Sequence, residues 1–239
     1  MLHLNIVPYC VMAACGVLSI VFFLKMRVKK ASPGALFAKA ITSVAFILSW
    51  LVLAKQNMNG FAMFIGGGLL FGLLGDIFLD LKFCYPVDDD VFTKQGFLSF
   101  AVGHVFYILA VIFGATCGFS VKALLCALGV AVIAALVVFF GEKAMQLHYG
   151  DYKIISTFYG ALLFFMTAFA IFTAVFNGVK ANMHLLVMGI GGVFFVISDL
   201  ILSGTYFGEG KNRPVDVITN HVTYYVAQFL IALSLAFMA

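Results

Sequence analysis

The stretch FAMFIGGGLLFGLLGDIFLD, residues 61–80, is apolar along almost its whole length and is long enough to cross a bilayer as a helix. A second stretch, HLLVMGIGGVFFVISDLILSG at residues 184–204, has the same character. Each stretch contains a deeply placed aspartate, Asp76 in the first and Asp199 in the second. A carboxylate at membrane depth is costly unless it is paired, protonated or facing water, so we expect both aspartates to be functional.

The composition of the whole chain places it in a membrane. Of its 239 residues, 64% are hydrophobic and 10% are charged, whereas a soluble domain is about 25% charged. The net charge of +4 comes from single basic residues in short loops, which argues against nucleic-acid binding. The five cysteines lack the spacing of a metal or redox motif and are interpreted mostly as small apolar residues. They are Cys10, Cys15, Cys84, Cys117 and Cys126.

Eight apolar segments, each near the length of about 20 residues that a spanning helix needs, divide the chain. They cover residues 4–24, 35–54, 61–81, 96–114, 120–140, 154–176, 184–203 and 219–238. None has the strict alternation of a membrane β-strand. The sequence therefore predicts an all-α, polytopic membrane bundle with eight transmembrane helices in a single domain, residues 1–239. We expect the first segment to be a retained helix, because no basic region precedes it as in a signal peptide.

Basic residues in the loops predict the orientation. Ten follow the first, third, fifth and seventh segments: Lys25, Arg27, Lys29, Lys30, Lys82, Lys94, Lys143, Lys153, Lys211 and Arg213. Three follow the second, fourth and sixth: Lys55, Lys122 and Lys180. Both termini are therefore predicted to be extracytoplasmic, and the short loops and absent tails favour a bacterial inner (plasma) membrane. Lys39, inside the second segment, is expected to snorkel to the interface.

On this topology, polar residues of four helices meet toward the cytoplasmic leaflet. Asp76 and Asp80 lie in the third segment, Asp199 lies in the seventh, and His104 and Tyr107 share a face of the fourth. The eighth segment has a polar stripe at helical spacing, formed by Asn220, His221, Tyr224, Tyr225 and Gln228. The outer halves of these helices are almost purely apolar. The pattern predicts a pocket that opens on one leaflet.

Each of these residues also has a purely structural interpretation. The stripe of Gly68 and Gly72 is typical of helix packing, and His104 is able to hydrogen-bond between helices. Tyr224 and Tyr225 are near a helix end, where tyrosines form interfacial belts. Asp80, and the cluster of Asp88, Asp89 and Asp90, are close enough to a loop to be solvated.

A faint internal repeat relates the two aspartates. Residues 66–79 align without gaps to residues 189–202, which places Asp76 opposite Asp199. The fourth and eighth segments follow at nearly the same offset. The third and fourth helices then correspond to the seventh and eighth, and copies four helices apart have the same orientation. This predicts a parallel 4+4 repeat about an axis along the membrane normal, with the aspartates facing each other.

An ordered set of short motifs runs from the third segment to the end of the chain. It consists of Gly75-Asp76, then Gly96, Phe100, Gly103, His104 and Tyr107 in the spacing GxxxFxxGHxxY, then Ser198-Asp199, then Tyr224-Tyr225-x-x-Gln228. This set resembles the YhhN-like lysoplasmalogenase family of eight-helix membrane hydrolases. The resemblance implies cleavage of the vinyl-ether bond of a lysoplasmalogen to a fatty aldehyde and a glycerophospho-base.

The resemblance also implies that Asp76 and Asp199 are the catalytic pair, and the chemistry of the residues agrees. Vinyl-ether hydrolysis needs a proton donor and an anion that stabilises an oxocarbenium ion, which two neighbouring carboxyls supply. The expected supporting or substrate-binding residues are Asp80, His104, Tyr107, Asn220, Tyr224, Tyr225 and Gln228. The partners implied are a lysophospholipid substrate and membrane lipids, with no metal ion or cofactor. Lys94, Lys211 and Arg213 are candidates to attract the phosphate.

Two alternatives remain open at this point. In the first, His104, His221, Asp76 and Asp199 bind zinc in a metal-dependent lipid hydrolase, although no HxxxH or HExxH spacing supports it. In the second, the aspartates are proton sites of a proton-coupled transporter or a lipid-binding protein. The scarcity of polar residues in the outer half argues against a transport route.

Overall fold

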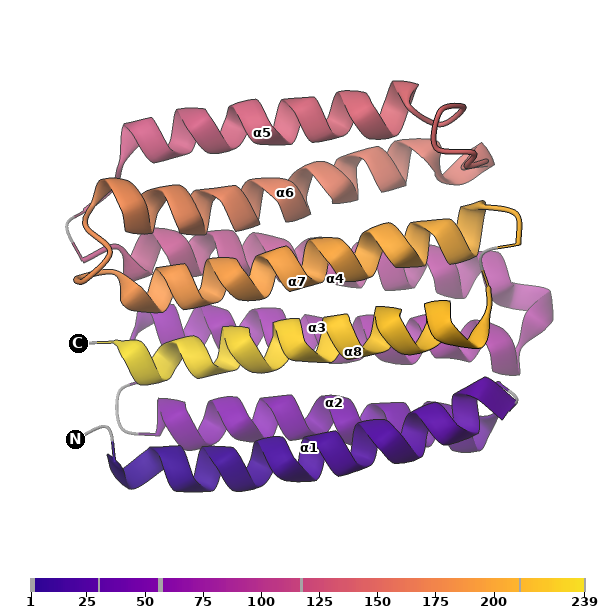
Figure 1. Ribbon diagram of the computed structural model, residues 1–239, viewed down its shortest axis with the longest axis horizontal. Helices are drawn as coiled ribbons and strands as arrows, with labels where there is room; N and C mark the ends of the chain where they lie inside the picture. Colours follow the sequence, from indigo (N-terminus) through magenta and orange to yellow (C-terminus); the bar gives the residue numbers. More distant parts are fainter. Residues whose placement is uncertain (1–2, 30, 56–57, 117, 211, 239) are drawn as a thin grey trace.

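The computed structural model describes residues 3–29, 31–55, 58–116, 118–210 and 212–238, where it has eight long α-helices (Figure 1). They are α1 (His3–Lys29), α2 (Pro33–Ala54), α3 (Gly60–Cys84), α4 (Asp89–Gly114), α5 (Val121–Phe140), α6 (Lys153–Phe176), α7 (Met183–Phe207) and α8 (Pro214–Leu233). Short 3₁₀ turns are η1 (Pro86–Asp88), η2 (Gly150–Tyr152) and η3 (Ser234–Phe237). The predicted all-helical class is confirmed. Lys30, Cys117 and Lys211 lie outside the described residues.

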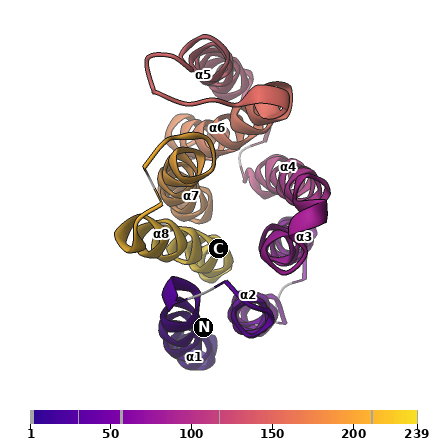
Figure 2. The ribbon, with the colours of Figure 1, turned by 90° about the vertical axis from the view of Figure 1, so that its right-hand side faces the viewer.

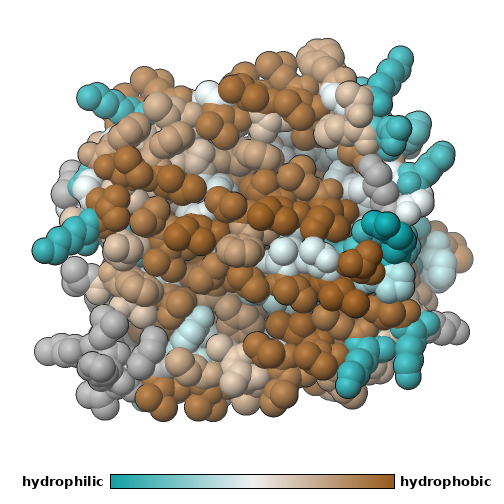
Figure 3. Space-filling model, viewed as in Figure 1, coloured by the Kyte–Doolittle hydropathy of each residue, from teal (hydrophilic) through white to brown (hydrophobic). Residues whose placement is uncertain are grey.

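The surface of the bundle suits a bilayer. Helices α1 to α7 are long and apolar enough to span a membrane. Figure 3 shows apolar side chains over the middle of one face and hydrophilic ones at its two ends. Helix α8 runs alongside α7 and is not among these candidate spans, and its buried face includes Asn220, His221 and Gln228. Its polarity is directed into the protein rather than toward lipid.

The packing of the helices has the pattern that the 4+4 repeat requires. Helix α1 packs on α2 as α5 packs on α6, and α3 packs on α4 as α7 packs on α8. Likewise, the pair α2 and α3 matches α6 and α7, and the pair α2 and α8 matches α6 and α4. Figure 2, which looks along the helices, shows α3 and α4 across from α7 and α8. The two halves therefore enclose a shared centre.

Several helices extend beyond their apolar segments. Helix α4 begins at Asp89, where two acidic residues in the first turn favour the positive helix N-terminus. Helix α8 begins with Pro214 after Arg213 and ends at Leu233, so it starts and stops about a turn earlier than predicted. These polar first turns contribute nothing to a hydropathy signal. The C-terminal ends of α1 and α3 are extended in the same way. Arg27 and Lys82, which were predicted in loops, therefore lie in the last turns of these helices.

Glycines in α3 let two polar side chains reach the centre of the bundle. A Cβ atom at Gly68 would lie 2.1 Å from the ring of Tyr107, and one at Gly72 would lie 2.6 Å from Nε2 of Gln228. Any larger residue would displace these side chains. The glycine stripe therefore does pack against neighbouring helices, and what it accommodates is the polar cluster of α4 and α8.

Candidate active site

Asp76 is held in a buried polar cluster at the end of the bundle away from both termini. It is 2% exposed. The Ser43 hydroxyl donates to its Oδ2 at 2.5 Å, and the Tyr224 hydroxyl donates to the same oxygen at 2.8 Å. The ammonium of Lys39 lies 3.4 Å from Oδ1. Three helices, α2, α3 and α8, thus fix one carboxylate.

Lys39 is an internal counter-ion, so the prediction that it snorkels to the interface is wrong. It is 4% exposed, and its Nζ also contacts Oδ1 of Asp80 at 3.2 Å. Asp80 is itself 5% exposed, so its interpretation as a solvated residue is wrong too. Both errors arise because α3 continues to Cys84 and covers positions expected at the helix end. The cluster has one cation against two carboxyl groups.

A chain of hydrogen bonds supports Asp76 from behind. Tyr224 accepts a bond from Nε2 of Gln228 at 3.0 Å, and the Oε1 of Gln228 accepts one from Tyr107 at 2.8 Å. The Tyr225 hydroxyl lies 3.3 Å from the backbone oxygen of Lys39. Tyr224 and Tyr225 are 6% and 0% exposed, so neither belongs to an interfacial belt. Burial and the hydrogen bond from Gln228 fix the direction of the Tyr224 hydroxyl, which donates to Asp76.

Asp199, on α7, has a much simpler environment. The Tyr159 hydroxyl of α6 donates to its Oδ2. In the part of the chain that the structure describes, no Lys, Arg or His forms an ion pair with Asp199. The preceding residue, Ser198, is locked to α8, since Nδ2 of Asn220 donates to its carbonyl oxygen at 2.7 Å and to its hydroxyl at 3.0 Å. This pair sets the position of α7 beside α8.

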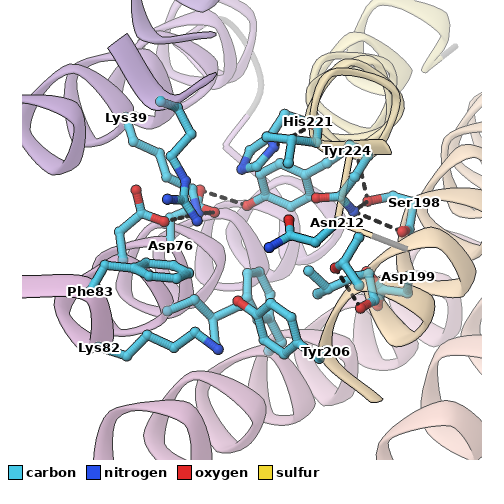
Figure 4. A pocket seen from close by; sticks show the side chains of 18 residues that line it. Lys39, Asp76, Lys82, Phe83, Ser198, Asp199, Tyr206, Asn212, His221 and Tyr224 are labelled. Atoms are coloured by element: carbon cyan, nitrogen blue, oxygen red, sulfur yellow. Dashed lines mark hydrogen bonds and ion pairs between the residues drawn. The ribbon is translucent and has the colours of Figure 1, made fainter. Parts of the chain in front are cut away.

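Both aspartates line one cavity of about 170 Å³, with Asp76 on one side and Asp199 on the other (Figure 4). Of the predicted site residues, it brings together Asp76, Asp80, Asp199, Asn220, His221 and Tyr224. Tyr107, Tyr225 and Gln228 lie behind this lining. Ser198 of the Ser198-Asp199 motif lines it too, as do residues that the sequence did not indicate, among them Arg27, Lys39, Lys82, Phe83, Tyr206 and Asn212.

His104 and His221, the histidines of the zinc alternative, do not line the same cavity. His104 does not line the cavity; its Nδ1 lies 2.6 Å from the Phe100 carbonyl, and its buried Nε2 has no hydrogen-bond partner in the described structure. Its ring packs edge-on against Tyr159, with 5.4 Å between ring centroids. His221 reaches the cavity, with its Nδ1 2.7 Å from the Val217 carbonyl. Among the described residues, no three His, Cys, Asp or Glu side chains are grouped as metal ligands.

The cations at the cavity differ from those predicted for phosphate binding. Lys94 lies over the ring of Tyr152, and Arg213 is paired with Asp216 at 2.9 Å, so neither lines the cavity. Lys211 is outside the described residues. Their places are taken by Arg27, whose guanidinium lies 3.8 Å from the ring centroid of Phe83, and by Lys82, whose Nζ lies 3.4 Å from that of Tyr206. The helix extensions described above bring both to the cavity.

Comparisons with known proteins identify the family of the chain. The sequence profile of the YhhN family matches residues 7–235. The chain is also similar to the lysoplasmalogenase TMEM86A of Homo sapiens, with 31% identity over 167 residues. That alignment covers 70% of this chain and 62% of the human protein, so the chain matches less than two thirds of the length of that relative. No solved structure matches the chain significantly.

Proposed function

The chain belongs to the YhhN family, and from that premise we propose that it is a lysoplasmalogenase. It hydrolyses the vinyl ether of a lysoplasmalogen to a fatty aldehyde and a glycerophospho-base. The observation that carries the proposal is the placing of Asp76 and Asp199 on opposite sides of one cavity with different partners. Similarity to the human lysoplasmalogenase TMEM86A supports the substrate class.

The reaction needs one proton donor and one anion. A proton adds to the outer carbon of the double bond, and the carbon attached to oxygen becomes an oxocarbenium ion. Water adds to that carbon, and the resulting hemiacetal loses the glycerol oxygen as an alcohol, which leaves an aldehyde. The overall balance is one vinyl ether and one water converted to one aldehyde and one alcohol. General acid catalysis of the first step accounts for about a hundredfold or more of the rate.

Asp199 is the proton donor in this proposal. Its partner in the described structure is the neutral hydroxyl of Tyr159, which binds Oδ2. A buried carboxyl without a paired cation is most stable when it is neutral. Oδ1 is then the oxygen that carries the proton, and the cavity that Asp199 lines admits the double bond to it.

Asp76 is the anion. Lys39 compensates its charge, and the hydroxyls of Ser43 and Tyr224 donate to it. Because Lys39 is shared with Asp80, the cluster retains a net negative charge when both carboxyls are ionised. That charge lies across the cavity from Asp199, where it stabilises the oxocarbenium ion and orients the attacking water.

The phosphate of the substrate binds at the cationic side of the cavity. Arg27 and Lys82 line this side, and each is held against an aromatic ring. The side chains of Asn212 and Asn220 are also in the lining, which gives the glycerol hydroxyl possible partners. The head group therefore stays at the end of the bundle, and the reacting bond lies between the aspartates.

The test is turnover by the purified protein of a lysoplasmalogen and of its saturated-ether analogue. We expect aldehyde from the vinyl ether alone, and in D₂O one deuterium at the carbon next to the aldehyde. Asp76→Asn and Asp199→Asn should each lower kcat by about a hundredfold or more. The control is Asp88→Asn, an exposed carboxyl outside the cavity, which should retain wild-type turnover. Near-normal turnover by either cavity variant would refute the dyad.

A further inference from the structure

A second cavity, larger and mostly apolar, opens on the flank of the bundle, and its lining also includes the ion pair of Arg213 and Asp216. It has a volume of about 740 Å³, within the range of about 300–1,000 Å³ that small-molecule sites have. It is lined by Ile133 and Val137 of α5, Phe164 of α6 and Leu200 of α7. Ile133, Val137 and Leu200 are exposed on the surface of spanning helices, so the cavity opens toward lipid.

A small cavity of about 70 Å³ lies between this apolar groove and the polar cavity of the candidate site. It shares with the groove the residues Val138, Tyr149, Phe164, Leu200 and Ser203. It shares with the polar cavity the residues Asp199, Leu202 and Tyr206. Asp199 therefore lies at a boundary, with polar and charged side chains on one side and aliphatic and aromatic ones on the other.

We propose that the groove and the small cavity bind the hydrocarbon chain of the lysophospholipid, which enters from the bilayer between α5 and α7. This rests on the proposed function for the position of the reacting bond. In a lysoplasmalogen the apolar chain meets the polar glycerophosphate at the vinyl ether itself. In the protein, the apolar and polar cavities meet at Asp199. The change in polarity along the substrate thus coincides with the change along the cavities.

The end of the groove is fixed by the loop between α5 and α6. The Tyr149 hydroxyl lies 2.9 Å from Oγ of Ser203, and its backbone N–H donates to Glu142 at 2.6 Å. Lys153 also donates to Glu142, at 3.1 Å. The Tyr149 N–H and Lys153 hold the pKa of the Glu142 carboxyl below its ordinary value. Tyr149 is therefore held in place between the groove and the small cavity.

Gly160 of α6 offers a way to block the passage without disturbing the aspartates. It lines the small cavity, and a Cβ atom built there meets only Cγ2 of Val138, at 3.5 Å, which is an ordinary contact. A leucine side chain at this position fills the passage. Gly129 of α5 is the matched control, since a Cβ there meets nothing within 4 Å and the residue is exposed outside the groove lining.

The experiment compares Gly160→Leu, Gly129→Leu and wild type on lysoplasmalogens with a hexadec-1-enyl or a but-1-enyl chain. For Gly160→Leu we expect kcat/KM on the long chain to fall by about tenfold or more, because at least two methylene groups lose apolar burial. On the short chain it should stay within about twofold of wild type, as should both values for Gly129→Leu. An equal loss on both chains, or no loss on either, overturns the inference.

A binding measurement separates this inference from the proposed function. The ligand is a radiolabelled saturated hexadecyl-ether lysophospholipid, which has no vinyl ether to hydrolyse, and the protein is held in detergent. If wild type releases no aldehyde, the proposed function fails, and binding lost in Gly160→Leu but kept in Gly129→Leu still supports the chain site. If aldehyde is released but neither glycine variant changes binding, the groove is ordinary lipid-facing surface and the chain site is wrong.

Discussion

The two halves of the bundle have the same helix packing but place residues of different charge beside their aspartates. Lys39 is the seventh residue of α2 and Tyr159 is the seventh of α6, the helix that α2 corresponds to in the repeat. Each side chain contacts the aspartate of the next helix, Asp76 or Asp199. A cation stands on one side and a neutral hydroxyl on the other. The repeat thus supplies two carboxyls and surrounds them with different partners.

The cavity has the same asymmetry over a wider area. The cationic Lys and Arg side chains that line it come from α1, α2 and α3, namely Arg27, Lys39 and Lys82. Among the described residues, α5 to α8 contribute no Lys or Arg to this lining. The first half is thus suited to stabilise two anions, the carboxylate of Asp76 and a phosphate. The second half is suited to a neutral acid and, through its apolar groove, to a hydrocarbon chain.

The largest effect is expected when the cation of the first half is removed. In Lys39→Met, Asp76 and Asp80 remain buried without a counter-ion, so we expect the free energy of unfolding to fall by about 3–5 kcal/mol. Thermal unfolding in detergent measures the loss. Adding Asp80→Asn should restore part of it, because one uncompensated carboxylate is removed.

The control for that variant is Lys153→Met, which breaks the more exposed ion pair with Glu142. Its effect should be within about 1 kcal/mol. Equal melting shifts for Lys39→Met and Lys153→Met would show that Lys39 is not the counter-ion on which the first half depends.

A smaller effect is expected in the second half. In Tyr159→Phe the ring still packs against Phe97 and His104, but Asp199 loses its hydrogen-bond donor. We expect kcat/KM for the lysoplasmalogen to fall about tenfold, the worth of one hydrogen bond to a carboxyl group, with little change in melting temperature.

Tyr152→Phe is the matched control for Tyr159→Phe. The Tyr152 hydroxyl also donates to an aspartate, Asp90, but that pair lies outside the cavity. Its removal should leave kcat/KM unchanged. Wild-type kinetics in Tyr159→Phe would mean that Asp199 needs no positioning, and the assigned difference between the halves would be lost.

The smallest effect is expected at the rim of the cavity. Lys82→Gln removes a partly exposed charge, so we expect KM for the lysoplasmalogen to rise about fivefold, equivalent to ~1 kcal/mol. An alkenyl glycerol without the phosphate should show no change. Lys122→Gln, which removes an exposed charge outside the three cavities, is the control for both substrates. A rise in KM for both substrates would contradict the assignment of Lys82 to the phosphate.

The sequence predicted the features that depend on long patterns. Hydropathy predicted the number of helices, and two aspartates in apolar runs predicted a site that includes residues of α3, α7 and α8. Lys39 was misjudged because its depth was measured from the end of an apolar run, and real helices continue into polar turns. The same extension hid Arg27 and Lys82. Tyr159 gave no signal, since a tyrosine in an apolar helix is ordinary. An alignment of α6 with α2 would have shown that Tyr159 occupies the position equivalent to Lys39.

Helix α8 follows the other seven in the chain and is the helix least suited to enter a bilayer by itself. Besides the bond between Tyr224 and Gln228, its Asn220, Tyr224 and Gln228 bind side chains or backbone of helices that precede it. During biosynthesis we therefore expect α8 to insert by docking onto the seven preceding helices rather than by partitioning into lipid. A chain halted before α8 lacks the Tyr224 hydroxyl that donates to Asp76, so we expect it to be inserted but inactive.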